Sequence, residues 1–159
     1  MEFRRHLCRA LFEDHRQTLA FLVRLEAFFG RGGAAFPRPF LDDLTRAVES
    51  GIGPHFAFEE EEVFPLLAAA GEEELGGLLL AEHRALLPLA ERIKELAALG
   101  RKGGFGEEDW GEFRDKGAAL LAGLGAHIEK EDRALLPLLD EILEEEEDAR
   151  LSLELAGRR

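Results

Sequence analysis

The amino-acid sequence predicts an all-α protein, arranged as an up-down-up-down bundle of four helices. Residues that favour helices, chiefly Ala, Leu, Glu and Arg, dominate the chain, while β-branched residues are scarce. Four long segments carry apolar residues at the spacing that places them on one face of a helix. The connections between these segments are short, and two of them are rich in glycine, as expected for antiparallel neighbours.

The first segment covers residues 2–29 and ends at a glycine-rich loop, residues 30–33. The second segment covers residues 39–70 and contains a weak point at residues 51–54. At that point Pro54 either kinks a continuous helix or begins a new helix after a loop, and the sequence leaves both alternatives open.

The third segment covers residues 72–99 and stops at a second glycine-rich loop, residues 100–104. The fourth runs from residue 107 to an acidic run at residues 144–148. The rest of the chain is expected to form a short extra helix or a frayed end. We therefore assign residues 1–146 to the bundle and residues 147–159 to a helical or frayed tail.

The composition excludes several classes of protein. A net charge of −13 repels phosphate backbones, so nucleic-acid binding is not expected. No segment approaches the roughly 18 consecutive apolar residues that a membrane span needs. The N-terminal residues lack the apolar stretch of a secretory signal, and the single cysteine, Cys8, cannot form an internal disulfide. We therefore expect a cytoplasmic protein that binds neither nucleic acid nor a membrane.

An internal repeat is the most informative feature of the chain. Residues 55–67 read HFAFEEEEVFPLL, and residues 127–139 read HIEKEDRALLPLL. Each stretch has a histidine, a glutamate four residues later, and Pro-Leu-Leu beginning ten residues after the histidine. A second pair also repeats, with Asp-His-Arg at residues 14–16 and Glu-His-Arg at residues 82–84. The chain therefore consists of two similar helical hairpins, each with a lone histidine and a His-x-x-x-Glu motif.

Six polar side chains interrupt the apolar stripes that should form the core. A spacing of four residues places each motif's histidine and glutamate on the same helix face, one turn apart. Burying an ionised carboxylate without a partner costs several kcal/mol, whereas bound divalent cations remove that cost. The six candidate metal ligands are His15, His55, Glu59, His83, His127 and Glu131.

The types and number of these side chains favour a site for two metal ions. Imidazole and carboxylate together suit iron, manganese or zinc. Two six-coordinate ions with one bridging oxygen need about ten further ligand positions, of which four histidines and two bridging glutamates supply about eight. The remaining positions would take a small exogenous ligand. The alternatives are a single zinc or structural ion and a metal-free network of buried histidines and glutamates, which the duplicated spacing disfavours.

At these motifs the sequence resembles the hemerythrin-like, HHE cation-binding family. The family pattern of Asp-His, His-Phe-x-x-Glu-Glu, Phe-Pro, Glu-His and His-x-x-x-Glu is matched at residues 14–15, 55–60, 64–65, 82–83 and 127–131. The resemblance extends over about residues 10–140. It implies a hemerythrin-like four-helix bundle with two iron ions joined by an oxo or hydroxo bridge, with manganese or zinc as alternatives. The six candidate residues are the implied ligands.

The chain departs from the oxygen-carrying hemerythrins at two places. Leu87 stands where those proteins have a fifth histidine, so reversible O2 carriage is not expected. They also end in His-x4-Asp, and Asp132 has that spacing from His127, but a regular helix turns it away from the face of Glu131. Four acids are candidates for an additional ligand or for orienting the ligands. These are Glu62, Asp132, Glu82 and Asp14.

We therefore expect a non-haem di-iron protein that binds or reacts with a small oxidant, O2, NO or peroxide, for sensing, storage or detoxification. Phe12 and Phe56 are expected to wall a dry pocket, and Glu60 and Glu61 to face solvent. One alternative is an iron store or donor for iron homeostasis or iron-centre repair, and another is a metal-free helical interaction domain. No general acid or base stands outside the expected ligands, so we assign no enzymatic reaction.

Overall fold

The computed structural model describes residues 2–30 and 37–158, and within them the chain is all-helical, with no strand. Three π-helical segments, η1 to η3, interrupt the α-helices. The elements are α1 (His6–Gly30), α2 (Arg38–Arg46), η1 (Ala47–Ile52), α3 (Gly53–Phe58), η2 (Glu59–Val63), α4 (Phe64–Ala69), α5 (Glu73–Gly103), α6 (Glu107–Lys130), η3 (Glu131–Leu135), α7 (Leu136–Ile142) and α8 (Glu145–Arg158). The loop expected after Gly30 lies outside the described residues.

Residues 38–69 form one uninterrupted helical rod through α2, η1, α3, η2 and α4. The alternative in which a loop before Pro54 splits this segment is therefore wrong. Each π segment contains the residue four positions before a proline, whose ring would clash with that residue's carbonyl in a regular α-helix. A proline alone does not impose a π turn, since Pro88 lies inside α5 without one.

Two of the predicted helix ends were wrong. α5 continues through the expected loop to Gly103 and ends at Gly104, whose φ of 83° is a conformation that glycine adopts easily. The fourth long helix ends at Ile142, and the acidic run begins α8 instead of closing the bundle. Acidic side chains in a first turn interact favourably with the helix dipole. The boundary expected between residues 146 and 147 falls inside α8.

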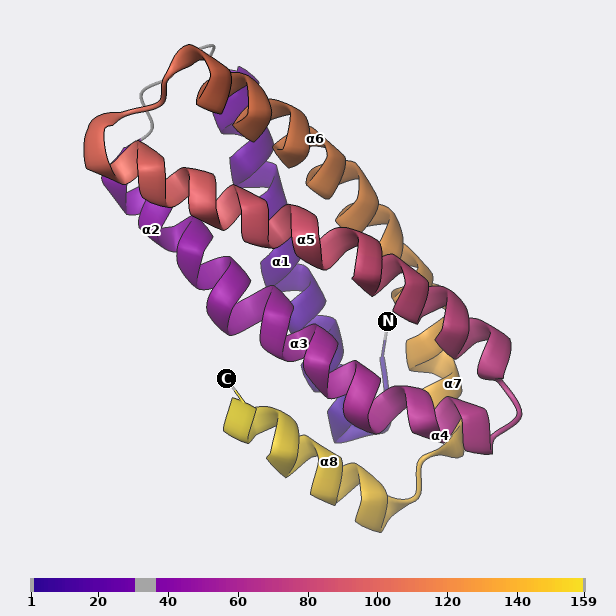
Figure 1. Ribbon diagram of the computed structural model, residues 1–159. Helices are drawn as coiled ribbons and strands as arrows, with labels where there is room; N and C mark the ends of the chain where they lie inside the picture. The colour runs from indigo at the N-terminus through magenta and orange to yellow at the C-terminus, as the bar shows by residue number, and fades with distance from the viewer. Residues whose placement is uncertain (1, 31–36, 159) are drawn as a thin grey trace.

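The four long helical rods, α1, residues 38–69, α5 and residues 107–142, lie side by side, and α8 lies alongside them (Figure 1). α8 packs against α1 and α3, with Leu151 and Leu155 buried. Asp148 of α8 is buried too, and its two carboxylate oxygens accept hydrogen bonds from the backbone N–H groups of His6 and Leu7 at 2.9 and 2.8 Å. The last helix therefore caps the first turn of α1.

The apolar core is divided into two clusters. The first contains Leu22 and Leu86 and lies towards the end of the rods where α5 meets α6, whereas the second contains Leu11 and Leu79. His15 follows Leu11 in α1 and precedes Leu22, and α5 repeats this order around its own histidine. The two cores therefore flank a layer of buried polar side chains. None of the helices in the described part of the chain has the length and apolar character needed to cross a bilayer.

Candidate metal centre

The six candidate ligands come from four helical rods and meet in the polar layer between the two cores. The histidines lie on α1, α3, α5 and α6, and the glutamates are the first residues of η2 and η3. Five of the six have at most 2% of the side chain exposed, and the exception is His55 at 12%. η2 and η3 thus begin at the two glutamates, Glu59 and Glu131, whose carboxylates lie in the polar layer. A π turn changes the direction in which the residues after it point.

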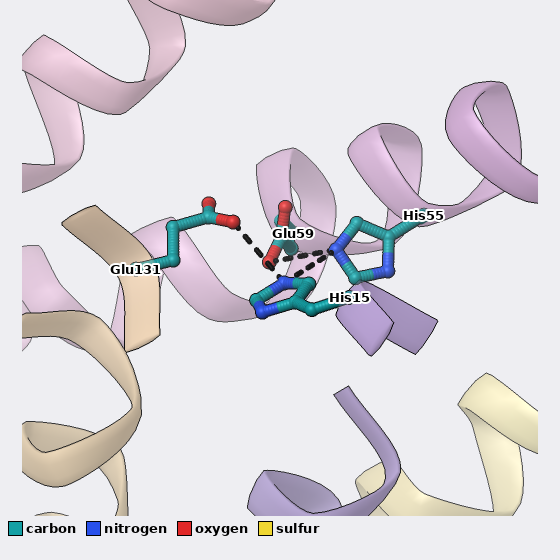
Figure 2. A group of neighbouring side chains, drawn as sticks. All are labelled: His15, His55, Glu59 and Glu131. Carbon is teal, nitrogen blue, oxygen red and sulfur yellow. Dashed lines mark hydrogen bonds and ion pairs between the residues drawn. The ribbon is translucent and has the colours of Figure 1, made fainter. Parts of the chain in front are cut away.

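A first cluster, shown in Figure 2, contains His15, His55, Glu59 and Glu131. Each residue contributes one potential ligand atom, and these four atoms lie within 4.8 Å of one another. Nε2 of His15 lies 3.2 Å from Nε2 of His55 and 3.2 Å from Oε2 of Glu131. Nε2 of His55 lies 3.3 Å from Oε1 of Glu59. One imidazole from each of α1 and α3 thus faces one oxygen from each glutamate.

A second cluster uses the other oxygen of each glutamate. Nε2 of His83 lies 3.4 Å from Oε2 of Glu59, and Nε2 of His127 lies 3.1 Å from Oε1 of Glu131. The two histidine nitrogens lie 3.1 Å apart. One potential ligand atom from each of these four residues also lies within 4.8 Å of the other three. Glu59 and Glu131 therefore belong to both clusters, each with one oxygen directed to either side.

The donor set fits a pair of cations. Both glutamates are fully buried, and none of their four carboxylate oxygens accepts a hydrogen bond within the described residues. Buried carboxylates without hydrogen-bond donors are rare because the lost hydration is not replaced. Four imidazole nitrogens and four such oxygens, directed at two points, form two sites of the type that non-haem iron, manganese or zinc binds.

Protonated histidines balance this charge in the metal-free chain. Burial by itself lowers the pKa of His55, but the neighbouring carboxylate of Glu59 outweighs it and holds this pKa well above its usual value. Burial likewise raises the pKa of Glu59, yet the positive charge of His55 lowers it overall. For His15, burial alone would lower the pKa, but the neighbouring carboxylates of Asp132 and Glu131 outweigh it and raise the pKa to about 9. The clusters are thus places where positive charge is stabilised.

Two acids reach across the bundle to the outer nitrogens of the lone histidines. Asp132 accepts a hydrogen bond from Nδ1 of His15 at 2.6 Å, and Glu60 accepts one from Nδ1 of His83 at 3.0 Å. Each acid immediately follows a cluster glutamate of the other hairpin. A proton held on Nδ1 leaves the lone pair of Nε2 directed into the cluster, which is the tautomer that binds metal.

The other two histidines are oriented within their own hairpins. Glu82 accepts a hydrogen bond from Nδ1 of His127 at 2.8 Å and also contacts Nζ of Lys130. Asp14 lies 3.6 Å from Nδ1 of His55. Three of the four additional candidate acids therefore lie near the outer nitrogen, Nδ1, of a clustered histidine. These three are Asp132, Glu82 and Asp14.

One acid is placed differently from the expectation. Glu62 does not reach either cluster, because its carboxylate forms an ion pair with Arg150 of α8 at 3.1 Å. Glu60 is exposed, as expected, but its carboxylate also contacts His83, which is fully buried, and this contact was not predicted from the sequence. The repeat contained a signal for this role, since Glu60 is the counterpart of Asp132.

Aromatic rings cover one side of the second cluster. The ring of Phe56 stacks on His83 with centroids 3.7 Å apart and meets His127 edge-on at 5.4 Å. Phe12, which was also expected at the pocket wall, packs against Phe3 instead, with ring centroids 5.8 Å apart.

A small, partly open space of about 10 Å³ lies beside the clusters, and we call it the inner cavity. Its volume is that of about one water molecule's accessible space. Apart from cluster residues and Thr18, its walls are apolar. The lining residues are His15, Thr18, Ile52, His55, Phe56, Leu124, His127, Ile128 and Glu131. A small ligand held here would meet both clusters in nearly dry surroundings.

The sequence matches a known protein family over most of its length. The family model described as the hemerythrin HHE cation binding domain matches residues 6–139, which include all six clustered residues but not α8. A search of curated proteins found no match.

Proposed function

Because the chain belongs to the hemerythrin HHE cation-binding domain family, we propose that it is a di-iron protein that binds or reacts with a small oxidant. In this proposal the helical rods adopt the up-down-up-down arrangement of that family, and the protein works in the cytoplasm. The oxidant is O2, NO or peroxide, and the role is sensing, storage or detoxification.

The sharing of Glu59 and Glu131 between the two clusters is the observation that carries the proposal. One iron ion would be held by His15 and His55, and the other by His83 and His127. Each glutamate would provide one oxygen to each ion, and an oxo or hydroxo group would complete the bridge. A single-metal site would leave half of these buried nitrogen and oxygen atoms without a cation.

When bound, two iron ions would supply open ligand positions and one-electron redox changes. The protein's own residues supply the surroundings. Phe56, Leu124 and Ile128 keep bulk water from the inner cavity, and the small volume of that cavity limits what can enter to molecules of a few atoms. Asp132, Glu60 and Glu82 hold protons on Nδ1 of their histidines, which keeps Nε2 available to a metal.

Iron storage or donation is the second candidate function, and the burial of the clustered side chains disfavours it. Five of the six side chains are at most 2% exposed, so a chelator or acceptor protein could not replace them without opening the bundle. We therefore expect iron to be retained tightly instead of exchanging.

The test is to measure metal content and visible absorption of protein purified anaerobically, then exposed to air and to azide. About two irons per chain, with bands that respond to azide, would support the proposal. Protein that stays colourless and metal-free after reconstitution with ferrous iron would refute it. The variant His127→Ala provides the matched control, since it should reduce both the iron content and the absorption.

A further inference from the structure

A larger open groove lies beside the metal centre, between α1, the rod of α2, η1 and α3, and α8. Its volume is about 390 Å³, within the range of sites that bind small organic molecules. We call it the outer groove. Leu155 and Arg158 of α8 form part of its wall, and α8 lies beyond the residues that the family model matches. The outer groove is therefore completed by a part of this chain that is not included in the family domain.

The inner end of the outer groove reaches the first cluster. Thr18, Ile52 and His55 line both the outer groove and the inner cavity. His55 is also the most exposed of the six clustered side chains. A molecule in the outer groove would consequently touch the side of the metal centre where it is most accessible, and would cover the residues that separate the inner cavity from solvent.

The rim of the outer groove carries an excess of positive charge in a chain that is otherwise strongly acidic. Arg24 and Arg46 both contact the single carboxylate of Asp43, at 2.8 and 3.3 Å. A hydrogen bond from Arg24 lowers the pKa of Asp43. The ionised carboxylate neutralises only one of the two guanidinium groups. A second acid group could bind between the two arginines, because guanidinium groups pair readily with carboxylates and related anions.

Between the rim and His55 the walls contain the apolar residues Phe21, Ile52, Pro54 and Leu155. They also contain four polar residues, Asp14, Gln17, Thr18 and Ser50. Pockets with apolar walls and a few convergent polar groups are typical of sites for organic ligands. A ligand with an apolar body and one acid group would match both parts.

We propose that the outer groove is a binding site for a small organic acid, and that its occupant covers Thr18 and His55 and so controls entry to the inner cavity. The binding site stands by itself, whereas the control of entry rests on the proposed di-iron function. Two experiments separate these parts.

The first experiment uses the metal-free chain of 159 residues and a fluorescent probe, 8-anilinonaphthalene-1-sulfonate, which has an apolar aromatic body and one sulfonate. Its uncharged analogue, N-phenyl-1-naphthylamine, tests the contribution of the acid group. Two variants address the outer groove. Arg46→Gln removes a rim charge, and Gly51→Phe places a ring in the groove, where an added Cβ meets no atom within 4 Å.

Matched variants lie away from the outer groove. Arg114→Gln removes another exposed arginine, on α6, and Gly77→Phe adds the same ring to α5, where a Cβ also meets no atom within 4 Å. We expect one saturable sulfonate site, with binding about tenfold weaker in Arg46→Gln and abolished in Gly51→Phe. The two matched variants should bind as the unmodified chain does.

Sulfonate binding that is unaffected by Gly51→Phe would overturn the site, since the probe would then bind elsewhere. Equal affinity for the charged and uncharged probes would overturn the assignment of an organic acid.

The second experiment measures the rate at which azide changes the visible spectrum of the iron-loaded chain. We expect the sulfonate probe, and separately Gly51→Phe, to slow this rate several-fold, while Gly77→Phe leaves it unchanged. An unchanged rate in saturated protein would overturn the control of entry and leave the binding result intact. Failure of the chain to take up iron would instead count against the proposed function, because the first experiment needs no metal.

Discussion

Asp132, at the start of η3, accepts a hydrogen bond from Nδ1 of His15 on α1 at 2.6 Å. This contact joins the end of one hairpin to the beginning of the other, and the repeat provides the reciprocal contact between Glu60 and His83. Both contacts hold a histidine by the nitrogen that faces away from the clusters. The orientation of each lone histidine therefore depends on the opposite hairpin.

The first prediction concerns this contact. Asp132→Ala should weaken iron binding about 10- to 100-fold, because His15 loses the partner that fixes its ring and its tautomer. Asp132→Asn keeps an oxygen that can accept the hydrogen bond, so its iron affinity should fall less than that of Asp132→Ala. Competition with a chelator measures the affinity. Asp115→Ala, an exposed acid of α6 that pairs with Arg114, is the control, and an equal loss there would contradict the orienting role.

The second prediction separates shared from unshared cluster residues. Glu131→Ala removes an oxygen from both clusters and should reduce iron from about two per chain to well below one. His15→Ala affects only the first cluster, so about one iron per chain should remain. Elemental analysis of protein with an unchanged helical circular-dichroism spectrum gives the comparison. Equal losses in both variants would argue against two sites that share their glutamates.

The third prediction is a pH dependence of the metal-free chain. Folding raises the pKa of His15 from 6.5 to about 9, so the folded state binds a proton that the unfolded state releases. This contribution to stability is complete below pH 6.5 and is lost as the pH rises through about 9.

The urea midpoint should accordingly fall over that range, and the fall should be smaller in His15→Gln. A midpoint that rises with pH over the same range would contradict the direction of the shift. Iron uptake should show the opposite trend, because metal binding displaces protons from the histidines.

The fourth prediction concerns the attachment of α8. Asp148→Ala removes the acceptor for two backbone N–H groups in the first turn of α1, and we expect a loss of about 2 kcal/mol of unfolding free energy. Chemical denaturation measures this loss. Glu146→Ala, an exposed residue of the same helix, should change stability by less than about 0.5 kcal/mol. Equal effects would show that the cap contributes nothing.

Much of the fold and of the candidate site follows from local sequence. Helix-favouring composition and apolar periodicity predict an all-helical chain, and the structure confirms this. The hemerythrin resemblance is confirmed by the family match over residues 6–139. The structure also brings together the six side chains that the repeat singles out. Spacing of four residues is sufficient to predict that His55 and Glu59 share a face, because it follows from the turn of a single helix.

Helix boundaries are less well determined by local sequence. The acidic run at residues 144–148 consists mainly of glutamates, which form helices well, so the sequence there gives no signal for a helix to stop. The end of α7 at Ile142 is visible only in the structure. α8 is ordered because Leu151 and Leu155 bury themselves against the rest of the chain, a tertiary effect that the charge pattern of the tail does not reveal.

The sequence by itself predicted the helical class, the family and the six polar side chains of the buried layer, because apolar periodicity and each short motif can be recognised along a single helix. Only the tertiary structure decided that Glu60 reaches His83, that Glu62 pairs with Arg150, and that α8 completes the outer groove. These contacts join residues on different helices. Their geometry depends on how the rods pack and on the π turns that rotate each rod, and periodicity along a single helix contains no information about either.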